Sequence, residues 1–442
     1  MSAPLSPRTR SRALQSARRA ATSLVVVGAV AAAGLVGTAA PSSVPVAPAA
    51  SQGPLNDVPE PVAGLAAAAT VTIDGTQYPN PLRLTDGTGV TTVQQWEGTR
   101  RAELLAAFRE NVYGQPLPRP TRQTFDVQST RVGDVVRKKV TIGITGPEGT
   151  GSFTLRLFVP AGATPRGTFL MIDHRGSVTD DPGQSSDYAP VSTITKAGYA
   201  FAQIDAEQIA PDDGGSYRSK MINLFHPSGE DLPDDAGRAI AAWAWGASRA
   251  MDYLQTDRDI DPTKIAVIGH SRSGKAALWA GAQDTRFAAV ISNNSGSTGA
   301  KLARRGDGGV GAETVSRVNS SFPYWFPKTY QAYGDKVDEL PVDQHELMGL
   351  VAPRRLVVAS ASEDSNADPE GEFLAYTAAA KIYDLYGLGD DGLGTTGWKP
   401  TADRAFAGPA MSYHLRSGGH GLKAADWKIY LDGDMFSRPA KG

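Results

Sequence analysis

The chain of 442 residues contains no cysteine, which excludes several kinds of chemistry at once. Without this residue there can be no disulfide, thiol nucleophile, zinc–thiolate site or lipid-bearing cysteine. The sequence also has no H-E-x-x-H metal motif and no G-K-[ST] phosphate loop, so we expect neither a metal ion nor a cofactor. The formal net charge is −2 and no basic stripe is present, which argues against nucleic acid as a partner.

Acidic residues are absent before Asp57, whereas five arginines lie within the first 19 residues. An uncharged apolar run over residues 20–37 and then small residues follow. This order predicts a signal peptide over residues 1–40, a secreted protein and no stable membrane association after cleavage. The pair Arg18-Arg19 is compatible with twin-arginine export, although the two alanines behind it match that signal poorly. The alternative is an uncleaved anchor, but the run is rich in Ala and Gly and soon meets Pro41.

Residues 41–70 are dominated by Pro, Ala, Ser and Val, a composition that predicts a flexible linker. We expect residues 71–442 to form a single catalytic domain. It should begin with an amphipathic helix from about residue 93 and an antiparallel hairpin made by residues 136–144 and 153–159. Short apolar runs then alternate with helical stretches such as 236–254. The runs predicted as strands are residues 168–172, 200–204, 265–268, 288–291, 356–359 and 411–414.

This order predicts an α/β fold, namely an α/β-hydrolase three-layer sandwich with a mostly parallel sheet and an antiparallel N-terminal hairpin. Active sites of such sheets lie at the carboxyl ends of the strands. At one of these ends the run Ile265–Ile268 leads into Gly269-His-Ser-Arg-Ser-Gly-Lys275 and then into a helix-forming stretch. A nucleophile elbow needs this strand–turn–helix context and small residues beside its serine. Ser271 is therefore the predicted nucleophile, although Ser273 stands where G-x-S-x-G has its second glycine.

A serine nucleophile needs a histidine base, and the histidine needs a carboxylate that fixes its tautomer. His420 follows the last predicted strand, where chain order places the base in this fold. His414, His270 and His345 are the alternatives, each read more readily as a structural residue.

The carboxylate should follow the strand at residues 356–359. Asp364 is preferred there, with Glu363 and Asp368 as alternatives, because Asp368 precedes Pro369 and suits a helix cap. A second oxyanion contributor is expected in Asp173-His-Arg-Gly176, although a polar loop would read the same way.

With these residues in view, the chain resembles the glucuronoyl esterase family, carbohydrate esterase family 15, in a bacterial form. The elbow of that family reads G-C-S-R-x-G-K, and here it reads Gly269-His-Ser-Arg-Ser-Gly-Lys275. The resemblance spans roughly residues 95–435. It includes Asn111-Val-Tyr-Gly114, Trp243-Ala-Trp245, Asp284-Thr-Arg-Phe287, Glu313-Thr-Val315, Tyr324-Trp-Phe326, Leu340-Pro-Val-Asp-Gln-His345, Ala352-Pro-Arg354 and His420-Gly421.

The resemblance implies a cofactor-free serine esterase that cleaves esters between 4-O-methyl-glucuronic acid of xylan and lignin alcohols. It implies that Ser271 attacks the uronate carbonyl, that Arg272 helps hold the oxyanion, and that Lys275 and Glu313 contact sugar hydroxyls. The partners would be glucuronoxylan-type carbohydrate esters, and we expect a monomer. The residues alone also allow non-functional roles. Lys275 could be a solvated lysine in the first turn of the helix, and Glu313 could be a carboxylate at the start of a helix.

Two departures from the family pattern bear on these expectations. Fungal members carry the acid in E-S-G, where this chain has Asn294-Ser-Gly296, which strengthens Asp364. The pattern D-x-W-A-D-P appears here as Asp364-Ser-Asn-Ala-Asp-Pro369, so Asn366 replaces the tryptophan that covers the sugar. Loss of that aromatic face would cost roughly 1 kcal/mol of sugar binding. An acetyl xylan esterase or general carboxylesterase is therefore the alternative, with a non-catalytic polysaccharide-binding relative as a different class.

Overall fold

The computed structural model describes residues 68–389, 400–433 and 435–437. They belong to one compact unit, residues 56–442. The predicted signal peptide and all but the last three residues of the predicted linker lie outside the described residues. In the part of the chain that is described, no helix combines the length and the apolar character needed to cross a membrane.

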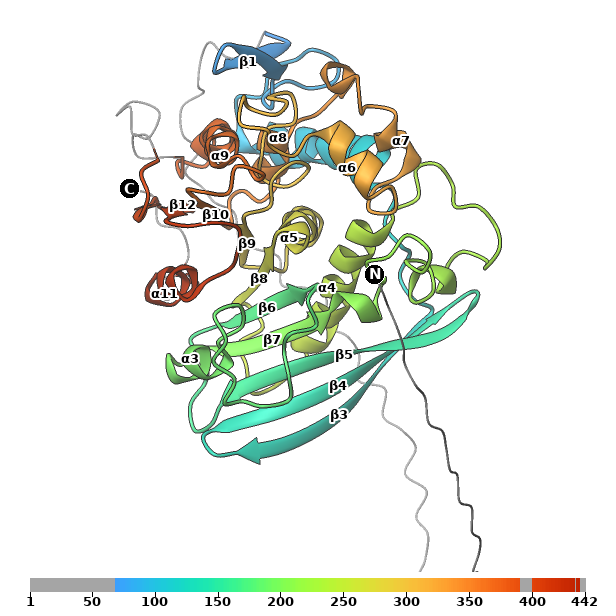
Figure 1. The fold of residues 1–442 in the computed structure, drawn as a ribbon, viewed down its shortest axis with the longest axis vertical. Coiled ribbons are helices and arrows are strands. Elements are labelled where there is room, and N and C mark those ends of the chain that lie inside the picture. Colours follow the sequence, from blue (N-terminus) through green and yellow to red (C-terminus); the bar gives the residue numbers. More distant parts are fainter. Residues whose placement is uncertain (1–67, 390–399, 434, 438–442) are drawn as a thin grey trace, which may run out of the picture. The chain divides into compact units, whose positions relative to one another are not determined.

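A ten-stranded sheet forms the centre of the molecule (Figure 1), in the order β11-β12-β10-β9-β8-β6-β7-β5-β4-β3. The strands from β12 to β7 in this order pair in parallel. Their side chains are buried on both faces, as expected for a sheet covered by helices. Their bounds are β6 Thr168–Asp173, β7 Ala200–Asp205, β8 Ile265–His270, β9 Ala289–Asn293, β10 Arg355–Ala361 and β12 Met411–Arg416.

The sheet begins with antiparallel strands, as predicted. β4 (Val135–Gly146) and β5 (Gly149–Pro160) pair as a hairpin around the turn at residues 146–149. β3 (Arg122–Val132) pairs with β4 but was not predicted, because most of its side chains are exposed and its apolar alternation is weak. Three further short strands also lacked a sequence signal. They are β1 Thr70–Ile73, β2 Thr76–Pro79 and β11 Arg404–Ala407.

Two separate apolar cores show that helices cover both faces of the sheet. Leu170 and Ile172 of β6 pack into the core that contains α4 (Ala239–Leu254) and α5 (Arg272–Gln283). Phe169 and Met171 pack into the core formed with α3 and α11, which lie on the opposite side of the sheet from α4 and α5 in Figure 1. The α/β-hydrolase three-layer sandwich predicted from the sequence is therefore confirmed. The remaining bounds are α3 Val191–Lys196, α6 Val315–Ser321, α7 Lys328–Gln331, α8 Gln344–Gly349, α9 Pro369–Asp384, α11 Ala424–Asp432, η3 Ala206–Gln208, η4 Ile222–Leu224 and η5 Val337–Glu339.

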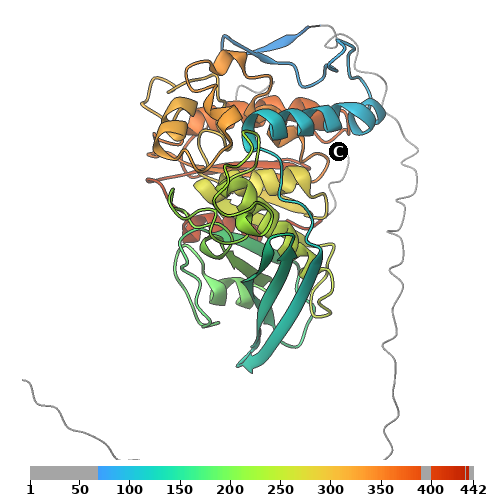
Figure 2. The ribbon, with the colours of Figure 1, turned by 90° about the vertical axis from the view of Figure 1, so that its right-hand side faces the viewer.

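The first predicted helix is a continuous helical segment from residue 93 to residue 113, visible as one long cyan rod in Figure 2. It consists of α1 Val93–Gln95, η1 Trp96–Arg100, α2 Arg101–Phe108 and η2 Arg109–Tyr113. Its apolar face packs into the core that also contains α4 and α5.

The sheet brings together the ends of strands that lie far apart in the sequence. β8 ends just before Ser271, and β9 beside it ends just before Asn294. β10 and β12 are neighbours in the same sheet, and the loops that follow them carry Asp364 and His420. Because all four strands are parallel, these four residues meet at the same edge.

Candidate active site

Ser271 lies on a sharply strained turn between β8 and α5. Its backbone φ is +58°, a conformation that residues other than glycine rarely adopt. A Cβ atom at Gly269 would lie 1.9 Å from the carbonyl oxygen of Ser273, so only glycine fits two residues before the serine. At Gly274 a Cβ would lie 2.9 Å from the Cβ of Ser295. Strain of this kind is typical of a nucleophile elbow, where the turn presents the serine hydroxyl at the top of the sheet.

A chain of two hydrogen bonds joins Ser271 to a histidine and a carboxylate. Ser271 Oγ lies 2.9 Å from His420 Nε2, and His420 Nδ1 lies 2.6 Å from Asp364 Oδ2. The His420 side chain is 39% exposed, whereas that of Asp364 is only 2% exposed. An imidazole placed in this way can take the hydroxyl proton, while the buried carboxylate fixes its tautomer.

The two alternative acids lie elsewhere. Asp368 caps the N-terminus of α9 by accepting a hydrogen bond from the Gly371 backbone, and Arg305 donates to its other oxygen at 3.0 Å. Glu363 is exposed, and the structure gives it a backbone bond to Gly418 and none to His420.

The alternative histidines have partners of their own. His414 Nε2 is bonded to Asp426 at 2.8 Å, and His345 Nε2 faces the carbonyl of Pro79 at 3.0 Å. His270 Nδ1 is bonded to the Asn293 side chain at 2.7 Å, and its ring lies 4.6 Å from that of His420 between centroids. Burial lowers the pKa of His345 to about 4, so this ring is neutral at physiological pH.

Asn294 stands beside the carboxylate rather than in its place. It has a positive φ of 46°, and its Nδ2 donates to Asp364 Oδ2 at 3.0 Å. Asp364 Oδ2 therefore accepts from both the amide of Asn294 and the imidazole of His420. The amide supplies a hydrogen bond that orients the carboxylate, but no charge.

The Arg272 side chain is held by three residues that sequence reasoning did not assign to the site. Asp212 accepts a hydrogen bond from Arg272 Nη1, and the guanidinium carbon lies 4.7 Å from the ring centroid of Trp325 and 5.3 Å from that of Phe322. These two rings stack at 3.8 Å. Trp325 belongs to a segment shared with the resembled family, but the loop of Asp212 carried no motif. Arg272 Nε is buried and has no hydrogen-bond partner among the described residues, so this donor is left unsatisfied.

Lys275 and Glu313 form an ion pair beside the nucleophile. Their charged atoms are 2.6 Å apart, and the side chains are 3% and 15% exposed. The Lys275 ammonium also donates to the backbone carbonyls of Ser295 and Ser297. Glu313 is held through its backbone N–H, which donates to the Asn366 carbonyl at 2.9 Å. The structure thus brings together the predicted sugar-binding residues.

A cavity of about 170 Å³, here called the Ser271 cavity, lies over these groups. Asp364 stands behind His420 and does not line it. The residues that line it are Ser271, Arg272, Lys275, Asn294, Ser295, Gly296, Glu313, Phe322, Trp325, Asn366, Ala367 and His420.

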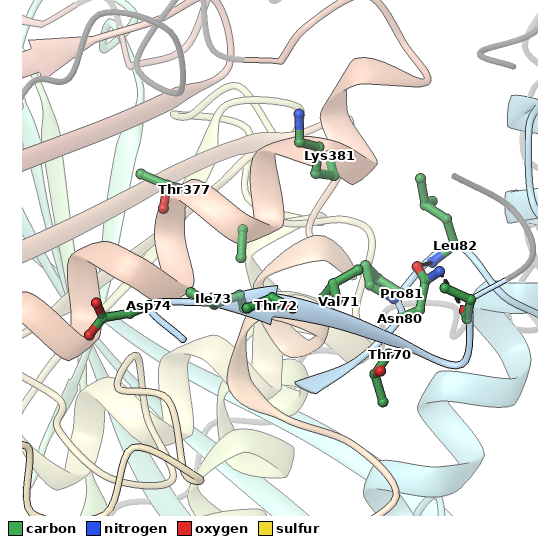
Figure 3. Close-up of a pocket in the computed structure, with 12 residues that line it drawn as sticks. Thr70, Val71, Thr72, Ile73, Asp74, Asn80, Pro81, Leu82, Thr377 and Lys381 are labelled. Atoms are coloured by element: carbon green, nitrogen blue, oxygen red, sulfur yellow. Dashed lines mark hydrogen bonds between the residues drawn. The ribbon is translucent and has the colours of Figure 1, made fainter. Parts of the chain in front are cut away.

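A larger cavity of about 610 Å³ lies between β1 and α9 and is called the β1–α9 cavity. Figure 3 shows Val71 and Ile73 of β1 on one side of it and Thr377 and Lys381 of α9 on the other. None of its lining residues is shared with the Ser271 cavity.

The loop expected to supply a second oxyanion donor lies against the elbow. His174 Nδ1 is 2.9 Å from Ser273 Oγ, and the carboxylate of Asp173 accepts the backbone N–H groups of Arg175 and Ser177 at 2.9 Å each. Burial, together with the charges of Arg272 and Arg175, lowers the pKa of His174 to about 3. A neutral imidazole therefore lies beside the elbow at every physiological pH.

The fold and the strained elbow define an α/β-hydrolase. Comparison with known proteins narrows this class: residues 148–387 match the family model described as glucuronyl esterase of fungi. Carbohydrate esterase MZ0003, from an unknown prokaryotic organism, is 38% identical over 80% of this chain and 88% of its own length. The 4-O-methyl-glucuronoyl methylesterase 1 of Wolfiporia cocos is 30% identical over 71% of this chain and 73% of its own.

A solved glucuronoyl esterase from Solibacter usitatus has the same fold. It superimposes with a TM-score of 0.73 at 36% identity and covers 82% of this chain and 98% of that one. The chain therefore belongs to the glucuronoyl esterase family, carbohydrate esterase family 15, and is a carboxylic ester hydrolase.

Proposed function

We propose that the protein is a secreted serine esterase that hydrolyses esters of 4-O-methyl-glucuronic acid, of the kind that join xylan to lignin alcohols. The observation that carries this proposal is the chain of short contacts from Ser271 Oγ through His420 to Asp364, at 2.9 and 2.6 Å. The relatives named for 4-O-methyl-glucuronoyl esters support the acyl group. The partners are glucuronoxylan-type carbohydrate esters, and export by the signal peptide of residues 1–40 brings the enzyme to them.

In the first half of the reaction, Ser271 Oγ attacks the ester carbonyl carbon while its proton moves to His420 Nε2. A tetrahedral intermediate forms, with the new Oγ–C bond in place and negative charge on the former carbonyl oxygen. The bond to the alcohol then breaks, and His420 returns the proton to the leaving oxygen. Asp364 stabilises the imidazolium and keeps Nδ1 protonated in both steps.

The negative charge on the tetrahedral oxygen needs donors that are already aligned. We assign this role to two groups of Arg272, the residue that directly follows the nucleophile. They are its unpartnered Nε–H and its backbone N–H. The loop Asp173–Gly176 is the second candidate source of a donor. One such donor in a closed site lowers the barrier by about 3 kcal/mol.

In the second half of the reaction a water molecule gives a proton to His420 and attacks the acyl carbon. The Ser271 Oγ–C bond breaks, the oxygen recovers the proton from His420, and free uronic acid leaves. Lys275 and Glu313 bind hydroxyls of the sugar ring and hold the carbonyl over the nucleophile, while Asn366 lines the same cavity.

A second candidate function keeps the mechanism and changes the acyl group, as in an acetyl xylan esterase or a general carboxylesterase. It is favoured by Asn366, which offers no aromatic face to the sugar ring.

The test compares the purified protein with its Ser271→Ala variant on benzyl glucuronate and on p-nitrophenyl acetate. We expect cleavage of the glucuronate ester and its loss in the variant. Turnover that survives in the variant would exclude Ser271 as the nucleophile. Turnover of the acetate alone would favour the second function, and polysaccharide binding without hydrolysis would favour a non-catalytic role.

A further inference from the structure

Asp212 is a partly buried carboxylate in the loop that follows β7 and η3, and the proposed mechanism does not use it. Its side chain is 11% exposed. Oδ1 accepts hydrogen bonds from Trp325 Nε1 at 2.7 Å and Tyr324 OH at 3.0 Å. Oδ2 accepts from Arg272 Nη1. The backbone of Asp212 is fixed as well, because its N–H donates to Glu207 at 3.0 Å and its carbonyl accepts from Tyr324 OH at 2.9 Å.

As a consequence, the Arg272 guanidinium is anchored at Nη1, while its Nε has no hydrogen-bond partner among the described residues. Asp212 holds Nη1, and the stacked rings of Phe322 and Trp325 restrict the plane from the side. Nε, which lies nearest to the backbone of the elbow, is buried and has no partner among the described residues. An arginine tied in this way keeps its orientation before the substrate arrives.

We propose that Asp212 is a positioning residue for the oxyanion donor: its carboxylate fixes the Arg272 guanidinium so that Nε–H faces the charge that develops on the substrate oxygen. This inference rests on the proposed function, because it assigns Arg272 to that oxyanion. A donor that is fixed in advance contributes most in the transition state, where the charge is largest. The loss of Asp212 should therefore lower kcat far more than it changes KM.

The two carboxylate oxygens of Asp212 have different hydrogen-bond partners, which distinguishes a positioning role from simple packing. Packing of Tyr324 and Trp325 needs only Oδ1, an acceptor that an asparagine also provides. Oδ2 faces Arg272, and there an asparagine would place an N–H group against another donor. Asp212→Asn therefore preserves the bonds to the aromatic residues and removes the one to the arginine.

The experiment measures kcat and KM for benzyl glucuronate in the wild type, Asp212→Asn, Arg272→Ala and the double variant. We expect Arg272→Ala to lower kcat by about 100- to 1000-fold and Asp212→Asn by about 10- to 100-fold, with KM changed less than threefold. In the Arg272→Ala background, Asp212→Asn should lower kcat less than twofold further, because the group that it positions is gone.

Asp213→Asn is the matched control from the same loop. The Asp213 side chain is bonded to Gly215 and Ser216 of its own turn and has no arginine partner in the described part of the chain, so kcat should be unchanged. Tyr324→Phe is a second variant that retains the charge and removes one donor to Asp212. It should lower kcat about two- to fivefold in the wild type and leave it unchanged in the Arg272→Ala background.

Each result bears on one of the two proposals. If the wild type does not hydrolyse the ester, the proposed function fails. If the wild type does and Asp212→Asn retains its kcat, only the positioning role fails. Full multiplication of the two single effects in the double variant would likewise contradict it, because Asp212 would then act independently of Arg272.

Discussion

The Ser271 cavity and the β1–α9 cavity differ both in volume and in lining residues, and volume alone would select the wrong one as the active site. The β1–α9 cavity holds about 610 Å³, against about 170 Å³ for the Ser271 cavity. The described residues that line the larger one include Val71, Ile73 and Leu82 but neither serine nor histidine. The smaller one is lined by Ser271, Arg272 and Lys275 of the elbow together with Glu313 and His420 from more distant parts of the chain.

The Ser271 cavity is thus distinguished from the β1–α9 cavity by its charged side chains of low exposure rather than by its volume. Burying an ionic group is unfavourable unless it is paired. The Ser271 cavity is lined by the pair Lys275–Glu313 and by Arg272, whose partner Asp212 lies outside the lining. The charged residues that line the β1–α9 cavity, Asp74 and Lys381, are also paired, but their side chains are 58% and 62% exposed.

The largest effect in this group is expected from Asp364→Asn. An asparagine cannot stabilise the imidazolium by charge and favours the wrong tautomer of His420, so kcat should fall by about 1,000- to 10,000-fold. The measurement is the initial rate on benzyl glucuronate at neutral pH.

Asp368→Asn is the matched control, since Asp368 lies in the same segment, is equally buried and caps α9. It should retain kcat within a fewfold while lowering stability. A large loss of kcat in Asp368→Asn together with full activity in Asp364→Asn would transfer the acid role.

A smaller effect is expected from Glu313→Gln. The change keeps the shape of the side chain but weakens its bond to Lys275 and the proposed bond to a sugar hydroxyl, so KM should rise about tenfold, corresponding to about 1.4 kcal/mol. The effect on kcat should be smaller. Michaelis–Menten kinetics on benzyl glucuronate check this.

The control is Asp307→Asn in the preceding loop, where the carboxylate accepts from the Gly309 backbone and does not line the Ser271 cavity. It should leave KM unaltered. An unchanged KM in Glu313→Gln would remove Glu313 from substrate binding and leave it as a partner of Lys275.

These residues also show how far the sequence could be read. The elbow was predictable because Gly269, Ser271 and the start of α5 are contiguous and their strain is local. His420 and Asp364 could be expected from the strand order, because the loops after β10 and β12 must meet at one edge of the sheet.

Other parts could not be read from the sequence because their causes are not local. The contact between Asp212 and Arg272 joins a loop to the first residue of α5, 60 residues further along the chain, and no motif in the sequence pairs the two. Strand β3 is held by pairing with β4 while most of its side chains face solvent, so its pattern has no clear period. Phe322 and Trp325 look like core aromatics, and only the folded chain brings their rings to Arg272.

Glu372, which is bonded to the cavity residue Gly296, should make the folding stability depend on pH. Glu372 is fully buried and accepts from the Gly296 backbone at 2.9 Å and from Ser360, and burial raises its pKa to about 8, with a contribution from Asp364. The folded protein therefore keeps this proton up to about pH 8, whereas the unfolded chain releases it near 4.5. The contribution of Glu372 to folding stability is fully present below pH 4.5 and falls as the pH rises toward 8, at up to about 1.4 kcal/mol or roughly 2 °C of Tm per unit.

Glu372→Gln mimics the protonated form and should remove this slope, as thermal unfolding scans from pH 5 to 8 would reveal. Glu346 is also buried, and its pKa of about 7 adds to the slope in both proteins, so the difference between wild type and variant is the quantity to measure. Glu370→Gln, at an exposed site on the same helix, is the control and should retain the slope. Parallel slopes in wild type and Glu372→Gln would show that Glu372 is ionised in the folded state.

The smallest effect is expected in the β1–α9 cavity. Thr377→Leu adds apolar atoms to a lining that already includes Val71 and Leu82, so kcat and KM should stay within twofold and Tm within about 1 °C.

The matched enlargement in the Ser271 cavity, Asn366→Trp, should instead lower KM for the glucuronate ester about fivefold, because an aromatic face contributes about 1 kcal/mol. A change of activity in Thr377→Leu as large as that in Asn366→Trp would mean that the two cavities are coupled, and that buried charge alone does not delimit the catalytic region.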